Sequence, residues 1–205
     1  MIILFLGPQG SGKGTQARLL SEKLGYLYFE SGGFLREISS KNEALRKSLA
    51  AGNLVPDEEM SSYVQSYLDE KAIFGNIVFD GFPRTLDQYN FFKKWLEKKQ
   101  AALDYVFVLN IGEEESIRRL STRRQDPQTG KIYNLITDTP PAGVDKAALV
   151  QREDDKPEAI KKRLEWYREL VLPLIEVLKK ETKLLEIDGE RPIDVIFKEI
   201  WSHFQ

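Results

Sequence analysis

The chain has 205 residues, and its 30 Lys and Arg against 32 Asp and Glu leave a formal net charge of −2. This length suits one main domain with insertions, and the balanced charge excludes a bulk attraction to nucleic acid or to an anionic membrane. The sequence contains no cysteine, which excludes a disulfide framework and thiolate metal sites.

Short apolar runs predict β-strands along the chain, and helical patterns separate them. The runs lie at 2–6, 26–29, 77–79, 105–110 and 184–187. This alternation predicts the α/β class, with a parallel five-stranded sheet that helices flank on both faces. Ligands of such sheets bind at the carboxyl ends of the strands, so we expect the site in the loops that follow the first three strands.

The first of these loops, residues 7–15, reads GPQGSGKGT. Its glycines let backbone N–H groups turn toward an anion, the dipole of the following helix favours negative charge, and Lys13 can reach the outer phosphates of a nucleotide. The usual pattern has Ser or Thr directly after the lysine, whereas here Gly14 intervenes before Thr15. The loop therefore predicts a nucleoside triphosphate site of an unusual kind.

Two stretches interrupt the alternation of strands and helices. Residues 30–55 read as helical pieces that end at 51–53, which predicts a small inserted lobe. Residues 124–155 are rich in turn formers and poor in large apolar side chains, which is typical of a functional lid or a disordered loop. Beyond them, Pro157 fits the first turn of a long helix, and Pro173 predicts a bend in it.

Motifs at five places carry a family resemblance: GKGT at 12–15, SGGFLR at 31–36, DGFPR at 80–84, RR at 123–124 and REDD at 152–155. In this order and spacing they resemble the nucleoside monophosphate kinases, and most of all the adenylate kinase family. The resemblance runs nearly end to end. It implies a P-loop kinase fold with a core at 1–29, 56–121 and 156–205, an AMP-binding lobe at 30–55 and a lid at 122–155.

The same resemblance implies the reaction: reversible transfer of the terminal phosphoryl group of Mg-ATP to AMP, giving two ADP. Transfer to a phosphate oxygen needs no base, because the acceptor is already anionic, but it does need neutralised charge and aligned nucleotides. Lysine and forked arginine side chains suit phosphate oxygens. The catalytic side chains that the resemblance implies are Lys13, Arg84, Arg123, Arg152 and Arg163.

The binding residues follow from the resemblance motif by motif. For ATP they are Gly10, Ser11, Gly12, Lys13, Gly14, Thr15, Arg119, Arg123, Ile132, Tyr133 and Arg191. For AMP they are Ser31, Arg36, Asn53, Leu54, Val55, Gly81, Phe82, Pro83, Arg84, Gln88, Arg152 and Arg163. The resemblance also implies a cis peptide bond before Pro83.

Asp80, at the end of an apolar run, is the candidate for holding Mg²⁺ through water, and the alternative is that it only caps its turn. Gly33 departs from the family, which commonly has aspartate there, so either Asp80 suffices or a nearby group substitutes. Because cysteine is absent, we expect no structural zinc in the lid, which packing around Tyr133 and Asn134 would hold instead.

Other functions stay open at this point. Gln88 can pair with the adenine edge but could serve another base, which keeps a UMP/CMP kinase as an alternative; the long lid favours AMP. The departure at Gly33 keeps a catalytically impaired nucleotide-binding sensor as another. A nucleic-acid-dependent ATPase finds no support in the charge balance.

No apolar stretch approaches the roughly 20 residues of a membrane span, and the start lacks a basic leader. We therefore expect a cytoplasmic protein without nucleic-acid or membrane partners, and the family resemblance implies a monomer.

Overall fold

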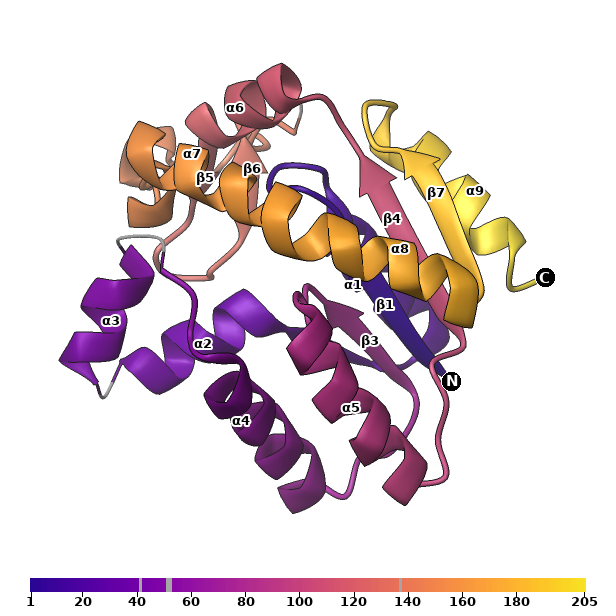
Figure 1. The fold of residues 1–205 in the computed structure, drawn as a ribbon. Helices are drawn as coiled ribbons and strands as arrows, with labels where there is room; N and C mark the ends of the chain where they lie inside the picture. Colours follow the sequence, from indigo (N-terminus) through magenta and orange to yellow (C-terminus); the bar gives the residue numbers. More distant parts are fainter. Residues whose placement is uncertain (41, 51–52, 137) are drawn as a thin grey trace.

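The structure is a computed structural model that describes residues 1–40, 42–50, 53–136 and 138–205. At its centre lies a five-stranded sheet in the order β2-β3-β1-β4-β7, in which every neighbouring pair is parallel (Figure 1). The predicted α/β class and five-stranded parallel sheet are confirmed. The strands are β1 (Ile2–Leu6), β2 (Leu27–Glu30), β3 (Ile77–Asp80), β4 (Tyr105–Asn110) and β7 (Leu184–Asp188).

Helices cover both faces of the sheet because successive side chains of a strand point to opposite faces. Ile3 and Phe5 of β1 pack against α1 and α9 in one hydrophobic cluster. Leu4 and Leu6 of the same strand pack with α4, α5 and α8 in another, and α8 crosses the front of the sheet in Figure 1. These helices are α1 (Lys13–Leu24), α4 (Asp57–Glu70), α5 (Leu86–Lys98), α8 (Leu172–Glu181) and α9 (Ile193–Ser202).

The second strand lies one residue later than its apolar run predicts. The N–H of Tyr26 donates to the carbonyl of Ser21 at 2.9 Å, so Tyr26 belongs to the turn that ends α1. At the other end, Glu30 pairs in register with Asp80, which the sequence placed just beyond its own strand. Both acidic residues therefore stand at the carboxyl edge of the sheet, on adjacent strands.

The two interrupting stretches have regular structure of their own. The first contains α2 (Ser31–Ser39) and α3 (Glu43–Ala50); of its expected end at 51–53, residues 51 and 52 lie outside the described residues. The second follows α6 (Glu113–Ser121) and holds the antiparallel strands β5 (Arg123–Gln125) and β6 (Ile132–Asn134). Two short 3₁₀ turns complete it, η1 (Lys146–Ala148) and η2 (Glu153–Asp155).

The long helix begins at Pro157 as predicted, with proline in the first turn of α7 (Pro157–Trp166). It passes through a π-helical segment, η3 (Tyr167–Val171), before continuing as α8. Pro173 lacks an N–H, and its ring takes the space of a carbonyl on the preceding turn. The π-helical segment directly before Pro173 is a wider turn that accommodates the ring, and the bend expected at Pro173 itself stays a prediction.

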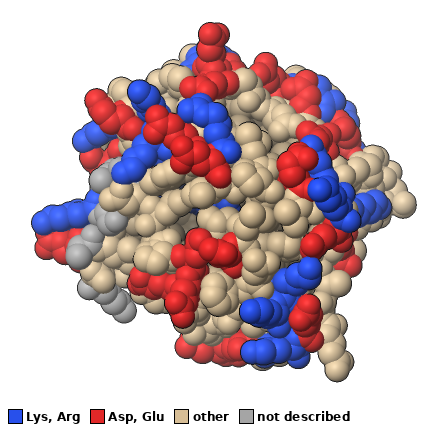
Figure 2. Space-filling view, viewed as in Figure 1, with Lys and Arg blue, Asp and Glu red and all other residues tan. Residues whose placement is uncertain are grey.

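On the face seen in Figure 2, acidic and basic side chains are interspersed around a largely uncharged centre. This mixture agrees with the balanced composition of the chain. Among the helices of the described ranges, none combines the length and apolar character that crossing a membrane requires.

Candidate active site

The glycine-rich loop joins β1 to α1 and presents the helix N-terminus to the carboxyl edge of the sheet. Gly10 and Gly12 have φ of 84° and 87°, a region that favours glycine, and Gly12 is the N-cap of α1. The Lys13 ammonium donates to the carbonyl of Pro8 at 3.2 Å, so it lies folded over the loop. Burial lowers the pKa of Lys13 to about 8, although Asp80 acts in the opposite direction. This arrangement is a ready anion site.

Arg119 ties this loop to its surroundings. Its Nη1 donates to the carbonyls of Gly10 at 3.3 Å and Gly189 at 2.9 Å. Glu115, one helical turn earlier, accepts from its Nε at 2.5 Å. The guanidinium therefore lies between the loop and the turn after β7, beside the predicted triphosphate site.

Gly14 is explained by the carboxylate that it faces. A Cβ at this position would lie 2.8 Å from Oδ2 of Asp80, a distance that side chains do not tolerate. The Tyr28 hydroxyl donates to the same oxygen at 3.0 Å, and burial raises the pKa of Asp80 while Lys13 opposes that shift. The absent Cβ lets the helix N-terminus approach the carboxylate closely.

The oxygen ligands available around Asp80 suit Mg²⁺, the metal that the family resemblance implies. Mg²⁺ prefers carboxylate and phosphate oxygens and keeps several waters, so a single protein carboxylate beside a phosphate site suits it. Asp80 lies next to Lys13 and Gly14 and offers that carboxylate. Asp80 would therefore hold the hydrated ion.

Two adjoining pockets open at this edge, and both are lined by Gly81 and Arg84. The other residues around the first pocket are Leu6, Gly7, Gln9, Lys13, Arg163, Tyr167 and Val171. The other residues around the second are Ser31, Leu35, Leu54, Val55, Met60 and Gln88. The first pocket thus collects cationic groups at the glycine-rich loop, and the second has a wide apolar wall.

Arg84 is held rigidly at the boundary between the two pockets. Its Nε donates to the carbonyl of Gly81 at 2.6 Å, and its Nη2 donates to the Ser31 hydroxyl at 2.9 Å. The expected cis bond between Phe82 and Pro83 is confirmed. Burial lowers the pKa of Arg84, which shows how little solvent stabilises its charge. A guanidinium so fixed is preorganised for an anion that spans the boundary.

Gln88 has an orientation that its partners dictate. Its Oε1 accepts from the backbone N–H of Arg84 at 2.8 Å, and its Nε2 donates to Oδ1 of Asp57 at 2.8 Å. A backbone N–H only donates and a carboxylate only accepts, so the amide has one assignment. The Thr85 hydroxyl caps α5 by accepting from the backbone N–H of Gln88 at 3.1 Å. This bond fixes the backbone from which the Gln88 side chain extends. An oriented amide beside apolar walls can read the edge of a base.

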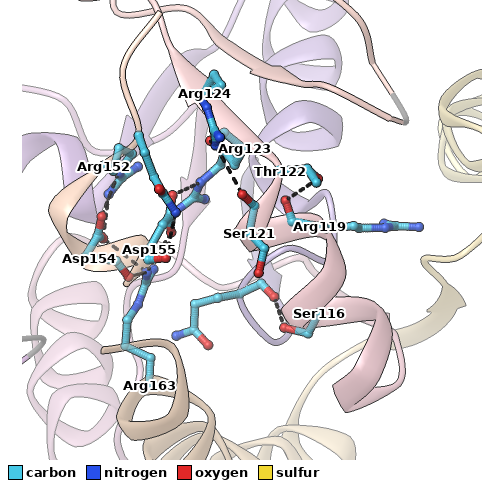
Figure 3. A network of polar contacts seen from close by, with 12 residues as sticks. Ser116, Arg119, Ser121, Thr122, Arg123, Arg124, Arg152, Asp154, Asp155 and Arg163 are labelled. Carbon is cyan, nitrogen blue, oxygen red and sulfur yellow. Dashed lines mark hydrogen bonds and ion pairs between the residues drawn. The ribbon is translucent and has the colours of Figure 1, made fainter. Parts of the chain in front are cut away.

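Three arginines of the 122–163 region, Arg123, Arg152 and Arg163, are paired with two adjacent aspartates (Figure 3). Arg123 makes a two-point contact with Asp155, at 2.7 and 2.5 Å, and the Asp155 side chain is fully buried. Arg152 does the same with Asp154, at 2.9 and 2.7 Å. Such fork-to-carboxylate pairs fix direction as well as position.

Arg163 reaches this cluster from α7. Its Nη1 donates to the Asp154 carbonyl at 3.0 Å and lies 3.1 Å from the Asp154 carboxylate. Burial opposes ionisation of Asp154, yet Arg152 and Arg163 together hold its pKa well below the usual range. Burial lowers the pKa of Arg163 itself, with Arg123 and Arg152 adding to that shift. The cluster is therefore rich in positive charge and suited to further anionic partners.

Five other predicted residues line neither pocket. Arg36 of α2 pairs with Glu30 at 2.8 Å, and its charge is coupled to that of Arg152. Asn53 accepts from the Lys162 ammonium, which joins the segment before α4 to α7. Ile132, Tyr133 and Arg191 lie outside both pockets: Ile132 is exposed, Tyr133 is buried in the small sheet, and Arg191 pairs with Glu199.

Several residues of the site had no sequence prediction. Glu30 and Tyr28 face Asp80 from β2, and Gln9 and Tyr167 line the first pocket. For Glu30 a signal existed, because an acidic residue at the carboxyl end of a strand lies at the expected ligand edge. Tyr167 had none, since only the packing of the long helix across the sheet places it there.

The chain is similar in sequence to known proteins over most of its length. A family model described as "Adenylate kinase" matches residues 5–183. A curated adenylate kinase of Petrotoga mobilis is 37% identical over 210 residues, covering 98% of this chain and 96% of that protein. One of Thermosipho africanus is 38% identical, with 98% and 97% covered, and one of Hydrogenobaculum is 37% identical, with 98% and 99% covered. The family model covers residues 5–183, and these relatives cover 98% of the chain. The chain therefore belongs to the adenylate kinase family.

Proposed function

We propose that this chain catalyses the reversible transfer of the terminal phosphoryl group of ATP to AMP, giving two ADP. The observation that carries the proposal is the pair of pockets that share Gly81 and Arg84. One pocket holds Lys13 and the glycine-rich loop, as a triphosphate requires, and the other pairs a polar end with apolar walls, as a nucleoside monophosphate requires. Arg84 lies where the two phosphates meet.

The chemistry follows from charge and alignment. The attacking AMP oxygen is already anionic, so the site needs cations around the transferred group rather than a base. Lys13 approaches from the donor side, Arg84 from the boundary, and Arg123, Arg152 and Arg163 from the paired-arginine cluster. Lys13, Arg84 and Arg163 line the first pocket, and Arg123 and Arg152 are electrostatically coupled to Arg163. Mg²⁺, held through water by Asp80, neutralises charge on the ATP phosphates.

The segments 30–55 and 122–155 are proposed as the AMP-binding lobe and the lid. The Arg123–Asp155 pair joins the two ends of the lid, and the Arg152–Asp154 pair lies within the second of these ends. The Lys162–Asn53 contact joins the lobe to the helix after the lid. A closed lobe and lid exclude water, which prevents hydrolysis from competing with transfer. We propose a cytoplasmic monomer, and light scattering of the purified protein tests its monomeric state.

An acceptor panel tests the function. ADP formation from Mg-ATP is measured with AMP, UMP, CMP and GMP as separate acceptors, each over a range of concentrations. AMP is expected to have the highest kcat/KM, because Gln88 offers an acceptor and a donor side by side. A better pyrimidine acceptor would overturn the AMP assignment, and binding of both nucleotides without any ADP would overturn the enzymatic one.

Replacing Gly14 by alanine is expected to lower kcat by at least about tenfold. The added Cβ lies 2.8 Å from the Asp80 carboxylate, so the carboxylate or the N-terminus of α1 must move. Gly75→Ala is the matched control, because a Cβ at Gly75 meets nothing within 4 Å. Equal turnover in the two variants contradicts the close packing of loop and carboxylate as a requirement of the reaction.

The affinity for ATP is expected to fall as pH rises above about 8, where Lys13 loses its proton in the free protein. A triphosphate favours the charged ammonium, so binding above that pH must take up a proton, and the affinity drops by up to about tenfold per pH unit. Below it, Lys13 is already charged and imposes no dependence. Calorimetry with a non-hydrolysable ATP analogue, in buffers of different ionisation heat, measures the uptake.

Lys13→Met is the control for this titration. Its affinity is expected to be low and to show no proton uptake at about pH 9. Uptake that persists in the variant assigns the titration to another group.

A further inference from the structure

Gly33 leaves a space at the acceptor side of the site, and Glu30 fills it. A Cβ at Gly33 would lie 3.2 Å from Oε2 of Glu30 and 3.7 Å from Nη2 of Arg36. Position 33 lies in α2, with no unusual φ, so the backbone there accepts any side chain. The carboxylate of Glu30 thus occupies the place that a short side chain from position 33 would take.

Glu30 also stands beside Asp80. The two residues are register partners on adjacent parallel strands, so their side chains leave the sheet on the same face. Tyr28, two residues before Glu30, is on that face as well and donates to Asp80. Glu30 and Asp80 are also electrostatically coupled, because Glu30 is among the charged groups that act on the Asp80 carboxylate.

Each of these carboxylates is neutralised by a cation that, in the proposed function, binds a phosphate during the reaction. Glu30 pairs with Arg36, and Asp80 faces Lys13. In the proposed function, Arg36 binds the AMP phosphate and Lys13 the outer phosphates of ATP. When the phosphates engage these cations, two carboxylates and two phosphates share the same edge of the sheet, and a divalent cation is the group that neutralises such a set.

We propose that Glu30 is the second carboxylate of the magnesium site: together with Asp80 it accepts hydrogen bonds from the water molecules of Mg²⁺, and its carboxylate does so from the place that a side chain at position 33 would otherwise take. The inference rests on the proposed function, because it takes the ion to arrive with ATP. Oε1 of Glu30 lies toward Arg36, 2.8 Å from its Nη2, and Oε2 lies toward Gly33. The Glu30 carboxylate therefore does two things: one oxygen orients Arg36, and the other is available to the water molecules of the proposed magnesium site.

The experiment measures Mn²⁺ binding, which needs no turnover. Mn²⁺ is titrated by electron paramagnetic resonance into the protein with a non-hydrolysable ATP analogue and AMP. Glu30→Gln is expected to weaken Mn²⁺ binding by about tenfold, the usual range for partners of metal-bound groups. Glu181→Gln is the matched control: its side chain is 38% exposed against 32% for Glu30, and it pairs with Lys93 at 2.8 Å.

A relocated carboxylate sharpens the test. Glu30→Ala is expected to bind Mn²⁺ as weakly as Glu30→Gln, and adding Gly33→Asp to it is expected to restore most of the affinity. The restored carboxylate comes from position 33, whose Cβ direction meets the vacated space. Gly33→Asp in the presence of Glu30 crowds two carboxylates into one place and is expected to give no gain.

Two results would overturn the proposal. Unchanged Mn²⁺ affinity in Glu30→Gln, with a change only in the dissociation constant for AMP measured by calorimetry, would show that Glu30 serves Arg36 alone. A double variant that is folded yet binds Mn²⁺ as weakly as Glu30→Ala would show that the carboxylate is not needed in this space. Neither result depends on ADP formation, so a failed acceptor panel remains distinguishable from a failed metal assignment.

Discussion

Replacing Lys13 by methionine is expected to lower kcat/KM for ATP by at least about 100-fold while the protein stays folded. The ammonium lies over the glycine-rich loop, and burial already lowers its pKa to about 8, so its charge is poorly satisfied until phosphates arrive. Methionine keeps most of the length and the apolar character of the stem but removes the charge that the proposed transfer requires. Steady-state ADP formation measures the loss.

Lys23→Met is the control for this change. Lys23 belongs to the same helix, α1, and its ammonium lies 5.1 Å from the centre of the Trp201 ring, away from both pockets. Its turnover is expected to match the unchanged protein. Circular dichroism and thermal melting check that both variants are folded. Full turnover in folded Lys13→Met would contradict the proposal that the Lys13 ammonium stabilises the phosphate charge.

Replacing Arg123 by methionine is expected to cost both activity and stability. Turnover is expected to fall by about 100-fold, because a cation beside the transferred phosphoryl group is lost. The free energy of unfolding is expected to fall by about 3 kcal/mol, because the fully buried Asp155 loses its two-point partner. Arg163, at 3.6 Å from the same carboxylate, compensates only in part. Enzyme assays and urea denaturation measure the two effects.

A double variant separates the two effects. Arg123→Met with Asp155→Asn removes the orphaned charge, so it is expected to regain most of the stability and none of the turnover. A double variant that is as unstable as Arg123→Met would mean that the loss comes from packing rather than from an uncompensated carboxylate. Recovery of turnover in the double variant would contradict a direct role of the guanidinium.

The aspartates of this cluster have a consequence for the resting protein. In the structure, Asp154 and Asp155 hold Arg152, Arg163 and Arg123, and Glu30 holds Arg36. These carboxylates keep clustered arginines from repelling one another before substrate is present. Arg84 differs, because backbone and hydroxyl oxygens orient it instead. The boundary arginine is thus positioned without any exchange of ion-pair partners.

Much of the site could be predicted because its residues follow from local chemistry. The strands are short apolar runs whose limits shift by one residue at most, as with Tyr26, which a hydrogen bond to Ser21 draws into the preceding turn. The glycine-rich loop must follow the first strand and open a helix, and it does. A parallel sheet brings the ends of such strands together, so Lys13, Ser31 and Arg84 meet at one edge.

The sequence by itself determined the fold class, the glycine-rich loop between the first strand and its helix, and the identity of the cationic side chains, since backbone geometry and charge are encoded in short segments. Only the tertiary structure decided which groups these side chains face. Glu30 and Asp80 are 50 residues apart yet adjacent in the sheet, and the space at Gly33 has meaning only once the Glu30 carboxylate is seen in it. Such partners depend on strand register and helix packing, which join distant segments and leave no mark in a local motif.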